Sequence, residues 1–340
     1  MAPTIKHVAK LANVSVATVS RVINQSKKVK QATRIKVEQA IEQLNFTPNA
    51  LGRNLSTAHT KSLGVVIPSL SNPVFADAVS GINQQAKSRG YTLMFTSTDY
   101  VAQDELQAVT SLLAYQVEGI ILTVANPIDN QALNLLIKNK IPYVLIYNQA
   151  SDAQHPVVTI DNINSGGGVA QKLLDLGHIK LAMISGNFAA SDRARARKQG
   201  FVDTITSAGH PTPLIIEVDF IEPDLDEILP PIFADPFTAP TALFCSNDLL
   251  AISVIGALGR MGLNVPHDIS VIGFDGIAIG AHLHPTLSTV IQPSHKMGLV
   301  ATQQLLDNIN GQDYHKTVIL PHIIRTGESA GIVPSVQINL

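Results

Sequence analysis

The chain has 340 residues, of which 45% are hydrophobic and 15% charged, and its formal net charge is −2. This length fits two or three domains, and the composition is typical of a globular chain rather than a disordered one. A lone cysteine, Cys245, excludes a disulfide framework, and the sequence has no metal-ligand motif, no long apolar run and no secretion signal at its start. We therefore expect a cytoplasmic protein that has no membrane partner, no metal and no other cofactor.

The charge is unevenly distributed along the chain. Residues 1–61 hold ten lysines and arginines against two acids, Glu38 and Glu42, so this segment carries a charge of +8. Residues 62–340 hold the other 14 basic and 24 acidic residues, a charge of −10. A small basic head on an acidic body favours a protein that offers one end to phosphates, although a solvated helix would also explain the charge alone.

The first 46 residues have the pattern of three short helices. Ile5, Val8, Ala9 and Ala12 fall at helical spacing after Thr4, which is placed to cap that helix. The turn Asn13-Val14-Ser15 follows, and a second helix over 16–24 is predicted to bury Val19, Val22 and Ile23. A third helix, over about 31–44, is predicted to turn inward Ile35, Val37, Ala40, Ile41 and Leu44. Such an arrangement is a helix-turn-helix, whose second helix enters the major groove of DNA.

From Lys61 onward, apolar runs alternate with stretches of helical periodicity. Buried strands are predicted at 62–68, 91–97, 117–124 and 141–147, with helices at 73–90, 103–116 and 129–140 between them. The alternation then repeats, with strands at 157–161, 179–185, 214–219, 241–245 and 270–275 and helices at 164–177, 191–209, 224–235 and 247–262. Two such series predict two doubly wound lobes of parallel sheet, which bind ligands at the carboxyl ends of their strands. The run Asn-Ser-Gly-Gly-Gly at 164–168 is interpreted as a close-packed helix start, because no Gly-Lys-Ser/Thr of a phosphate loop follows it.

A series of motifs extends along nearly the whole chain. In order they are TIKHVAKLANVSVATVSRVIN, PNALGRNLST, SNPVF, HPVVTIDN, LGHIKLAMISG, RKQGF, ALFCSNDLLAI, VPHDISVIGFDG and STVIQP. In this order they resemble the LacI/GalR family of bacterial repressors. The resemblance implies an α-helical helix-turn-helix head and an α/β core of two doubly wound lobes, like a periplasmic binding protein. Its expected parts are a DNA-binding domain at 1–46, a hinge at 47–60, an N-terminal lobe at 61–161 and 293–323, and a C-terminal lobe at 162–292 and 324–340. The chain would cross between lobes near residues 161, 292 and 323.

The second helix of the head would carry the sequence-reading residues. Arg21 can present a bidentate fork to guanine, although a phosphate contact is the alternative. Val16 and Ala17 stand where the family places specificity residues, and packing within the head is the alternative for both. Ser20 shares this outward face. We expect four further residues to position phosphates, although a helix cap alone would explain Ser15: Thr4, Ser15, Thr18 and Asn24. His7 stands where the family usually has aspartate, and the sequence assigns it no role.

Residues 48–57 match the family hinge. By resemblance, Leu55 would wedge between base pairs and open the minor groove, with Asn49 and Arg53 as further DNA contacts. A plain flexible linker is the alternative. Gly52, where alanine is usual, would weaken a hinge helix by about 1 kcal/mol.

Polar and aromatic residues cluster at the predicted strand ends, where the family binds its effector. Arg197 matches the family arginine that clamps effector hydroxyls, and Phe220 matches an aromatic face against the ligand. The complete predicted set is Ser69, Asn72, Phe75, Tyr147, Asn148, Asp161, Arg197, Phe220, Asn247, Asp275 and Gln292. A helix cap alone is the alternative for Asn247 and Asp248, and hydrogen bonding to backbone amides alone is the alternative for Asp275. Tyr147-Asn148 replaces the usual Asp-Arg, so a glycoside, a modified sugar or a nucleoside is open beside a plain sugar.

These features predict a ligand-responsive regulator, not an enzyme, that binds palindromic operator DNA as a homodimer and responds to a small-molecule effector, a sugar or derivative. The tail after Arg325 has no heptad repeat, which favours a dimer over a coiled-coil tetramer. Three alternatives are a purine- or nucleoside-responsive regulator of the same architecture, a sugar-binding protein without a DNA role, and an α/β enzyme. The missing secretion signal and the basic head argue against the second, and the lack of an ordered catalytic motif against the third.

Overall fold

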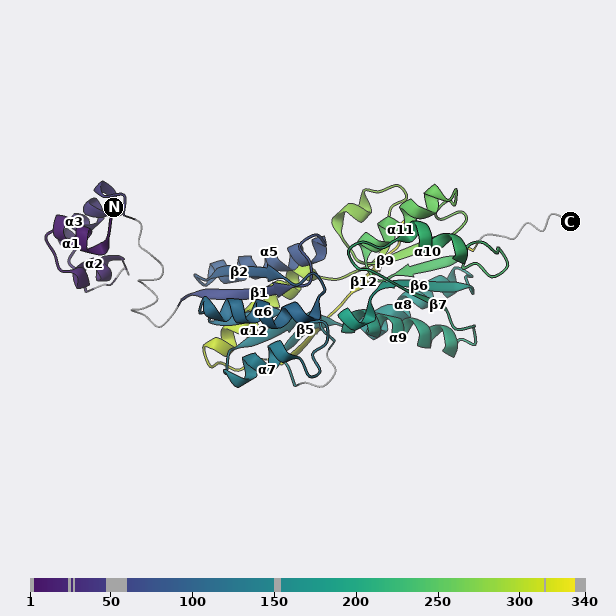
Figure 1. Ribbon diagram of the computed structural model, residues 1–340, viewed down its shortest axis with the longest axis horizontal. Coiled ribbons are helices and arrows are strands. Elements are labelled where there is room, and N and C mark those ends of the chain that lie inside the picture. Colours follow the sequence, from purple (N-terminus) through teal and green to yellow (C-terminus); the bar gives the residue numbers. More distant parts are fainter. Residues whose placement is uncertain are drawn as a thin grey trace. The chain divides into compact units, whose positions relative to one another are not determined.

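The computed structural model describes residues 3–23, 26, 28–46, 60–149, 154–314 and 316–333. The chain divides into two compact units, Met1–Thr60 and Lys61–Leu340. Figure 1 shows the first as a small helical body and the second as two lobes of sheet and helix. The predicted fold class, a helix-turn-helix head and a two-lobed α/β core, is confirmed.

The head consists of three helices around a small apolar core. Its helices are α1 (Ile5–Leu11), α2 (Val16–Ile23) and α3 (Gln31–Gln43). Val8, Val19 and Val37 are fully buried between them. Asn13 adopts a left-handed φ of 52° in the turn between α1 and α2, a conformation that asparagine tolerates well. The prediction that Ile35 points inward is wrong: it is 44% exposed, because the inward stripe of α3 runs through Val37 and Ala40 instead.

Each lobe of the second unit is built on a six-stranded sheet. The N-terminal lobe has the strand order β11-β5-β4-β3-β1-β2, and the C-terminal lobe has the order β12-β10-β9-β8-β6-β7. All pairings are parallel except that of β10 with β12. The strands are β1 (Ser62–Ile67), β2 (Thr92–Ser97), β3 (Gly119–Leu122), β4 (Tyr143–Ile146), β5 (Val157–Ile160), β6 (Leu181–Gly186), β7 (Leu214–Val218), β8 (Ala242–Cys245), β9 (Ser270–Asp275), β10 (Ser288–Ile291), β11 (Thr317–Leu320) and β12 (Ile323–Arg325).

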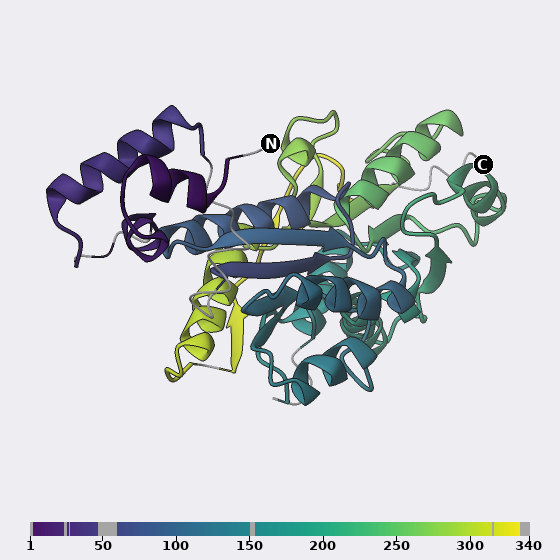
Figure 2. The ribbon, with the colours of Figure 1, turned by 60° about the vertical axis from the view of Figure 1, so that its left-hand side comes forward.

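Helices cover both faces of each sheet, as parallel sheets require. In the N-terminal lobe, α5 and α12 pack on one face and α6 and α7 on the other (Figure 2). In the C-terminal lobe, α8 and α9 pack on one face and α10 and α11 on the other. These helices are α5 (Pro73–Ser88), α6 (Ala102–Ala114), α7 (Gln131–Lys138), α8 (Asn162–Asp175), α9 (Asp192–Ser207), α10 (Leu225–Ile232), α11 (Asp248–Arg260) and α12 (Ser294–Ile309).

The prediction that the strand at 91–97 is buried is wrong. β2 lies at the edge of its sheet, and Phe95 on it is 57% exposed. The apolar run there looks like a central strand in sequence, but only one of its sides has a neighbouring strand. Met94 is exposed beside Phe95, so this edge presents apolar surface.

The chain passes between the lobes at three places. β5 belongs to the N-terminal sheet, whereas α8, which begins at Asn162, belongs to the C-terminal lobe. The second crossing joins β10 to α12, and the third joins β11 to β12 through residues 321–322. Ile323 already pairs with Ile291 in the C-terminal sheet, so that lobe begins one residue earlier than the expected boundary.

Glycines let α8 and α9 approach each other closely. A Cβ added at Gly166 would lie 2.1 Å from the carbonyl oxygen of Arg197, and one at Gly200 would lie 1.8 Å from that of Ile163. The interpretation of Asn-Ser-Gly-Gly-Gly as a close-packed helix start is therefore confirmed. The contact matters for function because Arg197 lies on α9, at the helix–helix interface.

Candidate functional site

The second helix of the head exposes a face of small and basic side chains. Val16 is 42% exposed, and Ala17 and Arg21 are also exposed, while Ser20 is half-buried. The burial of Val19 and Val22 on the opposite side fixes this orientation of α2. Packing within the head therefore does not account for Val16 and Ala17.

The predicted phosphate-contacting residues of the head also have local roles. The Ser15 hydroxyl accepts a hydrogen bond from the backbone N–H of Thr18 at 3.1 Å, which caps α2. Thr4 is the N-cap residue of α1, and its backbone N–H donates to Nδ1 of His7 at 3.2 Å. His7, to which the sequence assigns no role, thus has a structural contact at the start of α1. Four predicted DNA contacts lie outside the described residues: Asn24, Asn49, Arg53 and Leu55.

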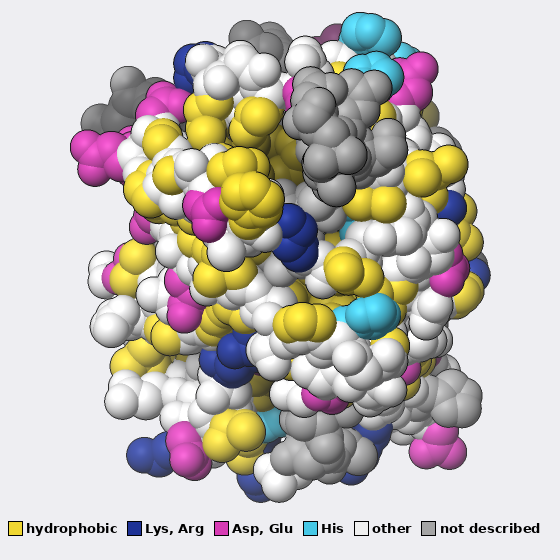
Figure 3. All heavy atoms as spheres, turned by 90° about the vertical axis from the view of Figure 1, so that its right-hand side faces the viewer, with side chains coloured by type: hydrophobic (Ala, Val, Ile, Leu, Met, Phe, Trp, Pro, Cys, Tyr) yellow, Lys and Arg dark blue, Asp and Glu magenta, His cyan; other side chains and the backbone are white. Residues whose placement is uncertain are grey.

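The charge on the second unit is distributed differently from that on the head. Figure 3 looks onto the end of the C-terminal lobe, where basic, acidic and apolar side chains are interspersed. Among the described side chains that this view shows, lysines and arginines do not gather into one patch.

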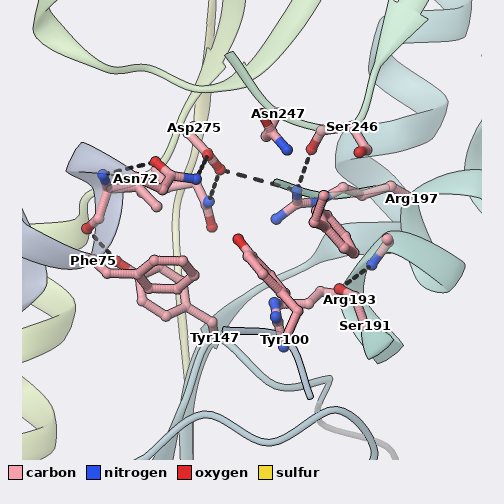
Figure 4. A pocket seen from close by; sticks show the side chains of 14 residues that line it. Asn72, Phe75, Tyr100, Tyr147, Ser191, Arg193, Arg197, Ser246, Asn247 and Asp275 are labelled. Carbon is pink, nitrogen blue, oxygen red and sulfur yellow. Dashed lines mark hydrogen bonds and ion pairs between the residues drawn. The ribbon is translucent and has the colours of Figure 1, made fainter. Parts of the chain in front are cut away.

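A pocket lies between the two lobes of the second unit (Figure 4). Eight of the eleven predicted effector residues line it, drawn from both lobes: Asn72, Phe75, Tyr147, Arg197, Phe220, Asn247, Asp275 and Gln292. The cavity measures about 20 Å³, room for roughly one water molecule. A larger molecule can enter only when the lobes separate or side chains in the pocket move.

Asp275 and Arg197 form the charged centre of the pocket. The Asp275 carboxylate accepts hydrogen bonds from Gln292 Nε2 at 2.8 Å and from Asn72 Nδ2 at 3.2 Å, and it lies 4.0 Å from Arg197 Nη1. Arg197 also donates from Nη1 to the carbonyl oxygen of Ser246 at 2.7 Å. Burial lowers the pKa of Arg197 to about 10, so the guanidinium stays charged at neutral pH.

The turn that carries Asp275 is held by a second buried carboxylate. Asp275 has a φ of 117° and Gly276 one of 77°, both positive. Oδ2 of Asp248 accepts the backbone N–H groups of Gly276 and Ile277, each at 2.8 Å. Oδ1 accepts the hydroxyl of Thr289 at 2.6 Å. Asp248 thus satisfies the backbone amides, and the Asp275 side chain is left to face the pocket.

Aromatic rings from both lobes form one wall of the pocket. Tyr100, which follows β2, stacks on Phe220, which follows β7, with ring centroids 4.1 Å apart and planes 6° apart. Tyr147 meets Phe75 edge-on at 5.4 Å and donates its hydroxyl to the carbonyl oxygen of Val74 at 2.9 Å. The Tyr100–Phe220 stack joins the lobes directly.

Three predicted effector residues do not line the pocket, because their side chains are engaged elsewhere. Ser69 accepts the backbone N–H of Asn72 at 3.3 Å, and Asp161 caps α8 by accepting that of Asn164 at 2.9 Å. Asn148 donates to Asp192 Oδ1 at 3.0 Å, across the lobes. Asn247 combines both roles, since its Oδ1 caps α11 through Leu250 N–H at 2.8 Å while the residue lines the pocket.

Four polar or aromatic residues of the pocket were not predicted from the sequence: Tyr100, Ser191, Arg193 and Ser246. Tyr100 follows the carboxyl end of β2, and the other pocket residues were predicted at the carboxyl ends of strands in the same way. Arg193 lies one turn before Arg197 on α9, in the run Arg-Ala-Arg-Ala-Arg. Among the residues that the structure describes, no group of three or more His, Cys, Asp or Glu side chains could hold a metal ion. Nor does the described part of the chain contain a helix of the length and apolarity that a membrane span needs.

Two family models match this chain, one at the head and one over the two-lobed unit. Residues 4–49 match the model of the bacterial regulatory proteins of the lacI family. Residues 60–325 match the model of periplasmic binding proteins and sugar binding domain of the LacI family. The chain is 34% identical to catabolite control protein A of Priestia megaterium over 96% of this chain and 98% of that protein. It is also 34% identical to the HTH-type transcriptional repressor PurR of Aliivibrio fischeri, over 93% and 94% of the two chains.

Solved structures share the architecture. The Lac repressor dimer bound to operator and the anti-inducer ONPF superposes with a TM-score of 0.83, at 26% identity, over 97% of this chain and 100% of that one. The complex of the transcriptional regulator CelR with cellobiose gives a TM-score of 0.70, at 27% identity, over 96% and 100%.

Proposed function

Because the chain belongs to the LacI family of bacterial regulatory proteins, we propose that it is a repressor that binds operator DNA as a dimer and is controlled by a small effector. The observation that carries this proposal is the pairing of two separate devices in one chain. One is the exposed helix face of the head, in the segment 1–61 that carries a charge of +8. The other is a polar pocket between the two lobes of the second unit. The first device fits DNA and the second a small ligand.

The exposed face of α2 supports direct reading of the major groove. Arg21 projects from this face with a guanidinium that matches the two acceptors of guanine, O6 and N7. Val16 and Ala17 are small enough to allow close approach and can contact a thymine methyl group. Ser15 and Thr18 stand at the start of α2, where hydroxyl and backbone groups commonly meet phosphates.

Arg21→Ala is expected to weaken binding to the best operator sequence by about 1–3 kcal/mol and to relax the preference at one base pair. A gel-shift series on operator variants, at fixed salt concentration, measures this. The matched control is Lys36→Ala, which removes the same charge from an exposed position of α3. It is expected to weaken binding to every DNA sequence alike. If Arg21→Ala behaves in the same way as the control, Arg21 holds phosphate and reads no base.

The edge strand β2 supports a dimer of these chains. Met94 and Phe95 are exposed on it, and large apolar side chains at a sheet edge are usually covered in an assembly. Two recognition helices would then meet the two halves of a palindrome.

The pocket supports a sugar or sugar derivative as effector. Asp275, Asn72 and Gln292 provide donors and acceptors for hydroxyl groups, and the stacked rings of Tyr100 and Phe220 give the pocket an apolar wall. A purine or nucleoside is the second candidate, because Tyr100 and Phe220 give the pocket an aromatic wall and a repressor named PurR is among the relatives. Isothermal titration of the full chain with sugars and nucleosides separates the two classes.

The effector would control operator binding through the relative arrangement of the two lobes. The pocket is lined from both, so an effector that binds there favours one relative arrangement of the lobes over another. Such coupling is reciprocal, and operator DNA must therefore change the affinity for the effector by the same factor.

A further inference from the structure

Arg193 is a buried arginine whose hydrogen-bonding capacity is largely unused. The residue is 5% exposed and lines the pocket between the lobes. Its Nη1 donates to the carbonyl oxygen of Val124 at 3.2 Å and lies 3.4 Å from Asp192 Oδ1. Within the described parts of the chain, Nε and Nη2 have no hydrogen-bond acceptor. Neither nitrogen is among the fully buried side-chain atoms that lack a partner, so both reach the open space at the pocket, where a bound molecule can accept from them.

The two acceptors that the Arg193 side chain contacts also accept from other groups. The carbonyl oxygen of Val124 also accepts from Asn148 Nδ2 at 2.7 Å. The Asp192 carboxylate accepts from Asn148 Nδ2 at 3.0 Å, from the backbone N–H of Gln149 at 2.7 Å and from that of Arg193 at 2.8 Å. Ser191 Oγ accepts the backbone N–H of Ala194 at 3.2 Å, which leaves its hydroxyl hydrogen to donate. The corner of the pocket formed by Ser191 and Arg193 therefore offers hydrogen-bond donors and few acceptors.

A corner of donors is suited to an oxyanion better than to a hydroxyl. A hydroxyl placed there would accept a bond, but its own hydrogen would lack a partner, whereas carboxylate and phosphate oxygens only accept. The planar guanidinium fork also matches two oxygens on one carbon or phosphorus atom. Arg193 lies in the first turn of α9, where the aligned peptide dipoles add positive potential.

The corner is separate from the polar group around Asp275. Figure 4 shows Arg193 and Ser191 beside Tyr100, on the side of the pocket away from Asn72 and Asp275. We propose that the effector carries a carboxylate or phosphate group that Arg193 and Ser191 bind, while the ring of the same molecule meets Asp275 and Asn72. This assignment rests on the proposed effector function of the pocket and narrows the chemical class of the effector to acidic or phosphorylated sugars.

The test compares matched neutral and anionic compounds on the full chain. Isothermal titration with glucose, gluconate and glucose 6-phosphate, and with the corresponding galactose series, is expected to show at least tenfold tighter binding of an anionic member. Arg193→Gln, which keeps a hydrogen-bonding side chain without charge, is expected to abolish that preference. Arg260→Gln removes an exposed arginine that pairs with Asp226 at 2.7 Å, and this control is expected to keep it. Whether the carboxylate or the phosphate member binds tells which oxyanion the corner takes.

A titration with inorganic phosphate covers the case in which none of these rings fits. Phosphate is expected to raise the melting temperature of the wild type and of Arg260→Gln, and not that of Arg193→Gln. Arg193→Lys, which keeps the charge but loses the fork, is expected to respond in between, and it serves if the glutamine variant fails to fold. Equal responses of wild type and Arg193→Gln, no response of the wild type, or equal affinity for neutral and anionic sugars would overturn the proposal.

A gel shift with operator DNA tests the proposed repressor function separately from the proposed oxyanion site. Operator binding without any preference for anions would remove the oxyanion site and leave the repressor. Loss of sequence-dependent operator binding would remove the repressor itself.

Discussion

Arg197→Ala is expected to bind operator DNA with the affinity of the wild type and to lose the response to effector, with effector affinity at least about 30-fold weaker. Arg197 is the arginine nearest to Asp275, at 4.0 Å, and its Nε donates to Asn162 Oδ1 at 3.0 Å. Its guanidinium also lies 3.5 Å from the ring centroid of Phe274. Truncation therefore removes a fork, a stacking contact and the counter-charge of a buried carboxylate together.

The measurement is a gel shift with and without a sugar that titrates the wild type, together with the titration itself. Arg260→Ala is the matched control, because that arginine is exposed and lies on α11, away from the pocket lining. Arg197→Lys retains the charge beside Asp275 and distinguishes loss of the fork from loss of the fold. An unchanged response in Arg197→Ala would show that the pocket does not bind the effector.

The pattern of the sequence predicted the fold well, because alternating strands and helices with Gly and Pro punctuation leave few topologies open. It failed where burial depends on a neighbour that periodicity does not reveal. The apolar run of β2 looks like a central strand, yet it lies at a sheet edge. Ile35 has the spacing of a core residue, but α3 is turned so that Val37 and Ala40 face inward.

The pocket was predicted in part for a similar reason. The carboxyl ends of neighbouring parallel strands meet at one edge of a sheet, so Asn247, after β8, and Asp275, at the end of β9, could be placed near one another from their positions alone. Position does not give the direction of a side chain: Ser69 holds the turn before α5 by accepting the backbone N–H of Asn72, and Asp161 caps α8. Tyr100 reaches Phe220 only because the two lobes meet, a contact between segments 120 residues apart that no local pattern encodes.

Gly200→Ala is expected to lower the free energy of unfolding by about 3 kcal/mol or more, one of the larger effects available to a single methyl group. The new Cβ would lie 1.8 Å from the carbonyl oxygen of Ile163, and this neighbour is backbone, which cannot rotate away. α8 and α9 must then separate. Urea or thermal unfolding of the full chain measures the loss.

Gly259→Ala provides the matched control within another helix. Its added Cβ would meet no atom within 4 Å, so the exchange is expected to leave stability unchanged or to raise it by up to about 1 kcal/mol through helix propensity. Similar melting of the two variants would contradict close packing of α8 on α9. Because Arg197 lies three residues before Gly200 on α9, and its carbonyl oxygen would lie 2.1 Å from a Cβ at Gly166, the separation also moves the arginine at the centre of the pocket. Any Gly200→Ala protein that still folds is therefore expected to bind effector more weakly than Gly259→Ala, while its head, a separate compact unit, retains its affinity for operator DNA.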